Sequence, residues 1–234
     1  MNSKKMQLFL LPFAGGNSAS FKYLTELLDK RVETISVEYA GRPGRHKEDY
    51  ITDYEEFLED AANYIRARRN DLPISVLGYS LGSVLAFDLI TKGKVEGDLR
   101  HCFICARRDL RDESISQRYH KLSDDEFVKR MMELGGIDQR ILENQRFLEI
   151  YMKPVRMDYA VWSQYKYREE GNKIPCNTTV MYSSKDPLSA NAHGWRDLTE
   201  GNIDFYELGD NHFFIHHHYR EMAEIVNDHL KLYM

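Results

Sequence analysis

Short apolar runs alternate along this chain with longer segments in which apolar residues recur every three or four positions. A short continuous apolar run is typical of a buried strand, and the three-to-four spacing is typical of an amphipathic helix. The runs predict strands at residues 6–11, 32–37, 74–77, 99–106, 178–182 and 203–208, and the periodic segments predict helices at 21–28, 54–69, 81–92 and 213–232. Strands that alternate with helices predict an α/β fold, with a mostly parallel sheet covered by helices on both faces.

One stretch interrupts this alternation. From residue 114 to about residue 166 no strand pattern occurs, and apolar residues with helical spacing predict two or three helices. An ordinary crossover between neighbouring strands is one alternative, but such connections are usually far shorter. We therefore expect a helical lid that is inserted between two strands and lies over the carboxyl ends of the sheet. The lid would belong to a single domain that spans residues 1–234.

Composition and charge narrow the classes of function. The chain is 42% apolar and 29% charged, which is typical of a globular protein, and its net charge of −5 provides no basic field for nucleic acid. Lys4 and Lys5 precede an apolar stretch as in a secretory signal, but Gln7 and Pro12 interrupt it and no cleavage motif follows. No run approaches the roughly 20 apolar residues of a membrane span. We expect a cytoplasmic protein that binds neither nucleic acid nor membrane.

Two patterns invite a metal-binding or redox interpretation. Cys102 and Cys105 form a C-x-x-C pair, but both lie in the predicted strand 99–106, where residues three apart point to opposite faces. Three consecutive histidines occupy residues 216–218 inside the predicted helix 213–232. Adjacent helical positions diverge by about 100°, so the three rings cannot all face one ion. We expect buried free thiols, partly exposed histidines and no metal site.

A G-x-S-x-G motif, Gly78-Tyr79-Ser80-Leu81-Gly82, is the clearest chemical signal. It follows the predicted strand 74–77 and opens the predicted helix 81–92, which is the strand–turn–helix setting of a nucleophile elbow. The helix N-terminus there favours a developing negative charge. The alternative is a plain strand-to-helix turn with a serine cap. We predict that Ser80 is a nucleophile.

A serine hydroxyl needs a neighbouring base to act as a nucleophile. His212 lies just after the last predicted strand, where the histidine stands in the chain order Ser–Asp–His, and we predict that it is this base. Asp186 and Asp109 compete for the role of the acid. Each follows a predicted strand at its carboxyl end and lies between Ser80 and His212, and either can instead cap its own turn. Chain order therefore leaves both aspartates open.

Acyl transfer also requires two backbone N–H groups that bind the oxyanion, one of them from the residue after the nucleophile. That residue is Leu81. The second donor is expected in the loop after the first strand, where Phe13 and Ala14 precede two glycines that allow backbone to approach a substrate closely. Either Phe13 or Ala14 fits this role. These groups together predict a serine hydrolase of the α/β-hydrolase class.

Further motifs extend across nearly the whole chain. They are Leu11-Pro12-Phe13-Ala14-Gly15-Gly16, Gly41-Arg42-Pro43-Gly44-Arg45, the elbow, Ala106-Arg107-Arg108, Leu122-Ser123-Asp124-Asp125-Glu126-Phe127, Leu134-Gly135-Gly136, Asp186-Pro187-Leu188, Trp195 and His212-Phe213-Phe214. In this order they resemble the type II thioesterases, the stand-alone editing enzymes of nonribosomal peptide and polyketide assembly lines. Two departures are Tyr79, where the family usually has histidine, and Asp210-Asn211, where a glycine-rich approach to the histidine is common. Neither departure removes a catalytic group.

The resemblance implies hydrolysis of acyl or aminoacyl thioesters on the phosphopantetheine arm of acyl or peptidyl carrier proteins. Such hydrolysis removes misprimed or stalled groups from the assembly line. The resemblance also implies that Asp186 is the acid, and that no cofactor is needed beyond the arm that the substrate brings. Two other functions stay open: a small-molecule carboxylesterase or lipase of the same fold, and a catalytically silent subunit that binds carrier proteins.

Overall fold

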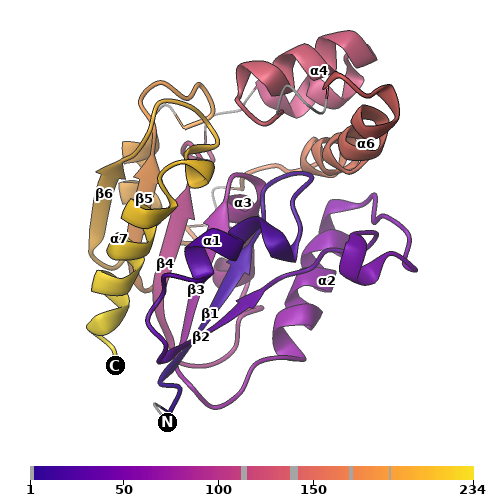
Figure 1. Cartoon of the computed structure of the whole chain (residues 1–234). Coiled ribbons are helices and arrows are strands. Elements are labelled where there is room, and N and C mark those ends of the chain that lie inside the picture. Colours follow the sequence, from indigo (N-terminus) through magenta and orange to yellow (C-terminus); the bar gives the residue numbers. More distant parts are fainter. Residues whose placement is uncertain (1–2, 112–114, 138–141, 169–170, 190) are drawn as a thin grey trace.

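The computed structural model describes residues 3–111, 115–137, 142–168, 171–189 and 191–234. Its centre is a six-stranded sheet in the order β2-β1-β3-β4-β5-β6, and every neighbouring pair of strands is parallel (Figure 1). The strands are β1 (Met6–Leu11), β2 (Val32–Ser36), β3 (Ile74–Tyr79), β4 (Leu99–Cys105), β5 (Asn177–Tyr182) and β6 (Ile203–Glu207). The apolar runs were thus predicted correctly as a parallel sheet.

Helices cover both faces of this sheet, as predicted (Figure 1). On one face α1 (Lys22–Thr25) packs against α7 (Tyr219–Lys231), and on the other α2 (Tyr54–Arg66) packs against α3 (Leu81–Thr91). The central helix α3 lies against β1, β3 and β4, and its residues from Leu81 to Ile90 are all buried. A helix that is apolar on every side is stable only when it is enclosed in this way.

Three helix predictions were wrong at their ends. The helix expected at 54–69 ends at Arg66. The first helix is shorter than 21–28, because a 3-10 turn at Ser18–Phe21, capped by Asn17, precedes α1. The last helix begins at Tyr219 rather than at residue 213, after a 3-10 turn at Phe214–His216. The three histidines 216–218 therefore lie in this turn and before the helix, not inside it. Within this stretch, the Ile215 N–H donates to the Tyr79 hydroxyl at 3.3 Å.

Residues 114–166 supply helices above the carboxyl ends of the strands (Figure 1). They are a 3-10 segment at Ile115–Lys121, α4 (Asp124–Glu133) and α6 (Gln145–Trp162), while residues 114 and 138–141 lie outside the described part. Ser123 and Glu126 form a reciprocal capping box that starts α4. Arg156 of α6 donates to the carbonyl oxygens of His120 and Leu122, each at 2.8 Å, and this bond joins α6 to the segment before α4.

The C-x-x-C pair lies in a buried strand of the sheet. Cys102 and Cys105 lie in β4 as buried free thiols, as predicted. Within the described ranges, no group of three or more His, Cys, Asp or Glu side chains is arranged to hold a metal ion. Among those same residues, no helix is long and apolar enough to cross a membrane.

His101, in β4, makes the stability of the fold depend on pH. Burial, together with the neighbouring His229, lowers the pKa of His101 from 6.5 to about 3. The unfolded chain therefore binds the extra proton between pH 6.5 and pH 3, and the free energy of unfolding falls as the pH falls through this window. Between pH 7 and pH 4.5, His101 alone should lower the free energy of unfolding by about 2–3 kcal/mol.

We expect His101→Asn to lose less stability than the wild type between pH 7 and pH 4.5, because asparagine has no proton to bind in this window. Urea unfolding at both pH values measures the difference. His46→Asn, at an exposed position, is the matched control. An equal loss in wild type and His101→Asn would show that other groups cause the acid sensitivity.

Candidate active site

Ser80 lies in a strained turn between β3 and α3. Its backbone has φ 54° and ψ −108°, a region that residues with a side chain rarely adopt. Two glycines make the turn possible. A Cβ on Gly82 would lie 2.0 Å from the Leu11 carbonyl oxygen, and one on Gly78 would lie 2.3 Å from the Gly82 carbonyl oxygen. The sequence forms a tight elbow here because only glycine fits at both positions.

The elbow places Ser80 beside a histidine and an aspartate from two other loops. His212 follows β6, and its Nε2 lies 2.9 Å from the Ser80 Oγ. Asp186 follows β5, and its Oδ2 lies 2.8 Å from the His212 Nδ1. All three residues are buried. The three side chains thus form one hydrogen-bonded chain at the carboxyl edge of the sheet.

The environment keeps Asp186 ionised. Burial by itself raises the pKa of its carboxyl group, but the interactions with His212, the Leu188 N–H and Ser189 together outweigh burial. The net pKa of Asp186 therefore lies below its ordinary value. An ionised carboxylate that accepts from Nδ1–H fixes the histidine tautomer in which Nε2 can accept the serine proton. This is the arrangement that general-base activation of Ser80 needs.

Asp109, the other candidate for the acid, is engaged elsewhere. It is buried after β4, but its carboxylate accepts hydrogen bonds from the Arg111 guanidinium and the Arg111 N–H, the latter at 2.8 Å. Gly194 packs directly on this carboxylate, since a Cβ there would lie 2.1 Å from Asp109 Oδ2. The structure therefore brings Asp186, and not Asp109, to His212.

Both predicted sources of oxyanion donors lie beside Ser80. Leu81 is the first residue of α3, and the first N–H of a helix has no acceptor within the helix. Phe13 and Ala14, in the loop after β1, line the same small pocket as Ser80. The pocket wall consists of Phe13, Ala14, Ser80, Met131, Gly136, Tyr151, Val155, Tyr159, His212 and Phe213. Residues from α4 and α6 thus complete a mainly apolar wall around the serine.

Tyr79 has a role that the sequence did not suggest. Its ring is fully buried, its hydroxyl donates to the His212 carbonyl oxygen at 2.7 Å, and the same hydroxyl accepts from the Ile215 N–H. Tyr79 therefore joins the elbow to the loop that carries the histidine. In the sequence, only the replacement of the family's usual histidine next to the nucleophile set Tyr79 apart. Its hydrogen-bond partner, His212, is 133 residues away and could not be predicted from the sequence.

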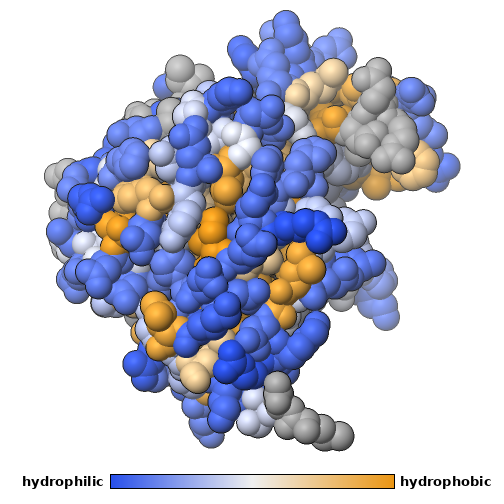
Figure 2. Space-filling view, turned by 60° about the vertical axis from the view of Figure 1, so that its left-hand side comes forward, coloured by the Kyte–Doolittle hydropathy of each residue, from blue (hydrophilic) through white to orange (hydrophobic). Residues whose placement is uncertain are grey.

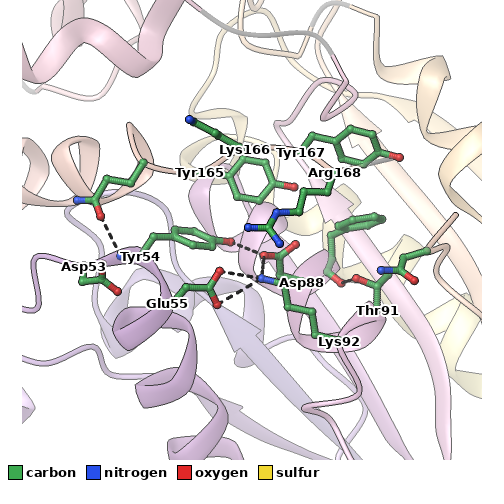
Figure 3. A pocket seen from close by; sticks show the side chains of 13 residues that line it. Asp53, Tyr54, Glu55, Asp88, Thr91, Lys92, Tyr165, Lys166, Tyr167 and Arg168 are labelled. Carbon is green, nitrogen blue, oxygen red and sulfur yellow. Dashed lines mark hydrogen bonds and ion pairs between the residues drawn. The ribbon is translucent and has the colours of Figure 1, made fainter. Parts of the chain in front are cut away.

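A second, larger cleft of about 280 Å³ contains none of these groups. Figure 3 shows it between the start of α2, the end of α3 and the chain after α6. Its charges are largely satisfied by one another: the Lys92 Nζ lies 2.9 Å from Asp88 and 3.1 Å from Glu55, and the Tyr54 hydroxyl donates to Asp88. Such mutual pairing leaves little charge for a ligand, so the candidate site is the smaller pocket at Ser80.

The sequence profile of a family described as "Thioesterase domain" matches residues 6–230. The chain belongs to this family. The predicted thioesterase is thereby confirmed at the level of the enzyme family.

Two proteins are similar in sequence to this chain over almost its full length. The gramicidin S biosynthesis protein GrsT of Aneurinibacillus migulanus is 25% identical over 99% of this chain and 91% of its own length. The thioesterase PikA5 of Streptomyces venezuelae is 26% identical over 96% of this chain and 81% of its own length. Of these two relatives of the thioesterase, one is thus named for gramicidin S biosynthesis and the other as a thioesterase.

Solved structures agree with the fold. The type II thioesterase BorB from the borrelidin biosynthetic cluster superposes with a TM-score of 0.82, at 26% identity over 97% of this chain and 93% of that chain. ClbQ, from the colibactin NRPS/PKS pathway, gives a TM-score of 0.89 at 20% identity over 97% and 98% of the two chains. The predicted α/β-hydrolase fold is confirmed.

Proposed function

We propose that this thioesterase is a type II editing enzyme that hydrolyses acyl or aminoacyl thioesters on the phosphopantetheine arm of acyl or peptidyl carrier proteins. The observation that carries the proposal is the hydrogen-bonded chain of Ser80, His212 and Asp186 in a thioesterase-family fold. Nearly full-length relatives named for gramicidin S biosynthesis and for the borrelidin cluster support the assignment to nonribosomal peptide and polyketide assembly lines. Such an enzyme would act in the cytoplasm.

In the proposed mechanism Ser80 attacks the thioester carbonyl carbon while His212 takes the serine proton at Nε2. Asp186 holds the ring and stabilises the imidazolium that forms. The N–H groups of Leu81 and of Phe13 or Ala14 would bind the oxyanion. His212 then protonates the sulfur of the leaving arm, and it activates the water that releases the acyl group from Ser80. No step requires a cofactor of the chain's own.

The helices of the segment 114–166 would form the wall of the acyl site and a docking surface for the carrier protein. Met131, Tyr151 and Val155 face the pocket at Ser80. On the outside, the apolar side chains of Met132 and Phe147 are 44% and 64% exposed. Apolar surface interrupts the mainly hydrophilic exterior near the top of the molecule, where these helices lie (Figure 2). Exposed apolar residues beside a catalytic pocket are typical of a surface that contacts a partner.

A comparison of three substrates tests the function: an acyl-loaded carrier protein, a short acyl-thioester mimic and a simple carboxylic ester. We expect the highest kcat/KM for the loaded carrier. A preference for the simple ester would favour the carboxylesterase or lipase. Failure to hydrolyse any of them, together with failure of a fluorophosphonate probe to label Ser80, would favour the catalytically silent carrier-binding subunit.

Charge reversal on α4 tests the docking surface. Lys129 and Arg130 are exposed on α4 and would attract an acidic carrier protein. We expect Lys129→Glu with Arg130→Glu to raise KM for the loaded carrier by about 10-fold, since each exposed charge pair contributes up to about 1 kcal/mol. The KM for the short mimic should not change.

The matched control for this reversal is Arg220→Glu with Lys231→Glu on α7, which covers one face of the sheet while α4 lies above the carboxyl ends of the strands (Figure 1). Lys231 pairs with a carboxylate three residues away, just as Arg130 does, so the two double variants disrupt similar local contacts. If both variants change KM equally, or if the short mimic responds as strongly as the carrier, α4 is not the docking surface.

A further inference from the structure

A buried ion pair joins the lid helix α6 to the loop that carries the second oxyanion donor. Asp158 of α6 accepts a hydrogen bond from the Gly15 N–H at 2.7 Å and pairs with the Arg42 guanidinium. Arg42 in turn donates from Nε to the Gly16 carbonyl oxygen at 3.1 Å. Gly15 and Gly16 directly follow Phe13 and Ala14 in the chain. Both polar groups thus hold the backbone next to the proposed donor.

An apolar contact joins α6 to the same loop one turn earlier. Gly15 has φ +80°, and a Cβ there would lie 2.3 Å from the Val155 Cγ2. Val155 and Asp158 are three residues apart and therefore lie on the same face of α6. Val155 also lines the pocket at Ser80. This part of α6 is consequently seated directly on the oxyanion loop, with no space between them.

Stability alone does not explain why charges occupy this position. The side chains of Arg42 and Asp158 are only 2% and 3% exposed. Burial raises the pKa of Asp158 above its ordinary value. The charge and hydrogen bond of Arg42 and the hydrogen bond from the Gly15 N–H offset only part of this rise. Replacing a buried ion pair by apolar residues of similar volume is often neutral or stabilising for a fold. What an apolar pair cannot do is bind the Gly15 N–H and the Gly16 carbonyl oxygen.

We infer that Asp158 and Arg42 are positioning residues that fix the backbone of the loop 13–16 so that its donor N–H faces the oxyanion. The inference rests on the proposed acyl-transfer function. It makes α6 from Val155 to Asp158 a fixed part of the catalytic site rather than a part of a lid that opens. The two residues act only through the loop backbone and do not touch the substrate.

The decisive variant is the double substitution Arg42→Met with Asp158→Leu, which removes both charges and keeps the volume filled. We expect this variant to stay folded with a lowered Tm, because the Gly15 N–H and the Gly16 carbonyl oxygen lose their partners. Its kcat should fall by about 100-fold, the lower end of the cost of losing one oxyanion donor. KM for the short acyl-thioester mimic should stay close to the wild-type value. The shape of the pH profile of kcat should also be unchanged, because His212 and Asp186 keep their contacts.

Arg42→Lys provides a second measurement if the double variant folds poorly. Lysine keeps the charge beside Asp158 but loses the Nε hydrogen bond to the Gly16 carbonyl oxygen, so we expect a smaller fall in kcat, again without a change in KM. Asp124→Asn is the matched control, since it breaks the ion pair between Asp124 and Arg156 within the lid, at 2.9 Å, without reaching the loop. Its kcat should equal that of the wild type.

A wild-type kcat in folded Arg42→Met with Asp158→Leu, or in Arg42→Lys, would overturn the inference. A fall in kcat that Asp124→Asn shares to the same extent would overturn it as well. Neither result would affect the proposed function, which is decided by whether the wild-type protein hydrolyses loaded carriers at all.

Discussion

Replacing Ser80 by alanine should abolish thioester hydrolysis and leave the fold intact. The loss of kcat should approach a million-fold, which is the cost of removing the nucleophile in the best-studied serine hydrolase. The Ser80 Oγ bonds to His212, while the turn itself depends on Gly78 and Gly82, so Tm should change little. Turnover of acyl-loaded carrier protein and thermal unfolding measure the two effects. Near-normal turnover in protein free of wild-type enzyme would end the proposed mechanism.

Ser83 offers a matched control three residues further along α3. Its hydroxyl contacts the carbonyl oxygens of Gly78 and Cys105 at 2.8 and 2.9 Å and accepts from the Cys105 N–H. Ser83→Ala should therefore lower the free energy of unfolding by about 1–3 kcal/mol, because it leaves buried polar groups unsatisfied. It should nevertheless keep most of the turnover. Ser80→Ala should therefore lower turnover with little change in stability, whereas Ser83→Ala should lower stability with little change in turnover.

Asp186→Asn should have the second-largest effect, lowering kcat by about ten-thousand-fold. An asparagine amide beside Nδ1 favours the tautomer in which Nε2 carries the proton, and such a ring cannot accept the proton of Ser80. The fold should tolerate the change, because asparagine retains an oxygen that can accept from the Leu188 N–H. Steady-state kinetics on the short acyl-thioester mimic measures the effect without a contribution from docking.

Asp109→Asn is the comparison that ranks the two aspartates. It weakens the ion pair with Arg111 but leaves the contacts of His212 unchanged, so we expect a modest loss of stability and at most a few-fold loss of kcat. If Asp109→Asn were the more damaging substitution, the acid would belong after β4 rather than after β5, and Asp186 would have only a structural role.

Much of the fold followed from local patterns. A run such as residues 6–11 is buried on both faces of a parallel strand, so it is apolar at every position except Gln7 and is recognisable without knowledge of its neighbours. The elbow was equally local, because its two glycines and its serine stand within five consecutive residues. The start of the last helix was misjudged because the chain after His212 first makes a 3-10 turn, whose Ile215 N–H binds Tyr79.

The choice between the two aspartates shows where local patterns stop. Asp109 and Asp186 both follow parallel strands, and parallel strands end at the same edge of a sheet, so sequence position gave them equal access to His212. Only the resemblance to type II thioesterases favoured Asp186. In the folded chain Arg111 engages the Asp109 carboxylate, and the turn after β5 directs Asp186 at the imidazole ring.

The sequence by itself determined the parallel sheet and the elbow at Ser80, because each depends on the spacing of residues that are close in the chain. It also indicated the candidate base His212, because this residue follows the last strand in the chain order Ser–Asp–His. Tertiary structure alone decided which acid meets His212, that Tyr79 supports the histidine loop, and that Asp158 binds Gly15 from 143 residues away. The physical reason is that a buried polar group needs a hydrogen-bond partner, which can come from any part of the chain that packs beside it. The spacing of apolar and polar residues along the chain does not indicate which residue this partner is.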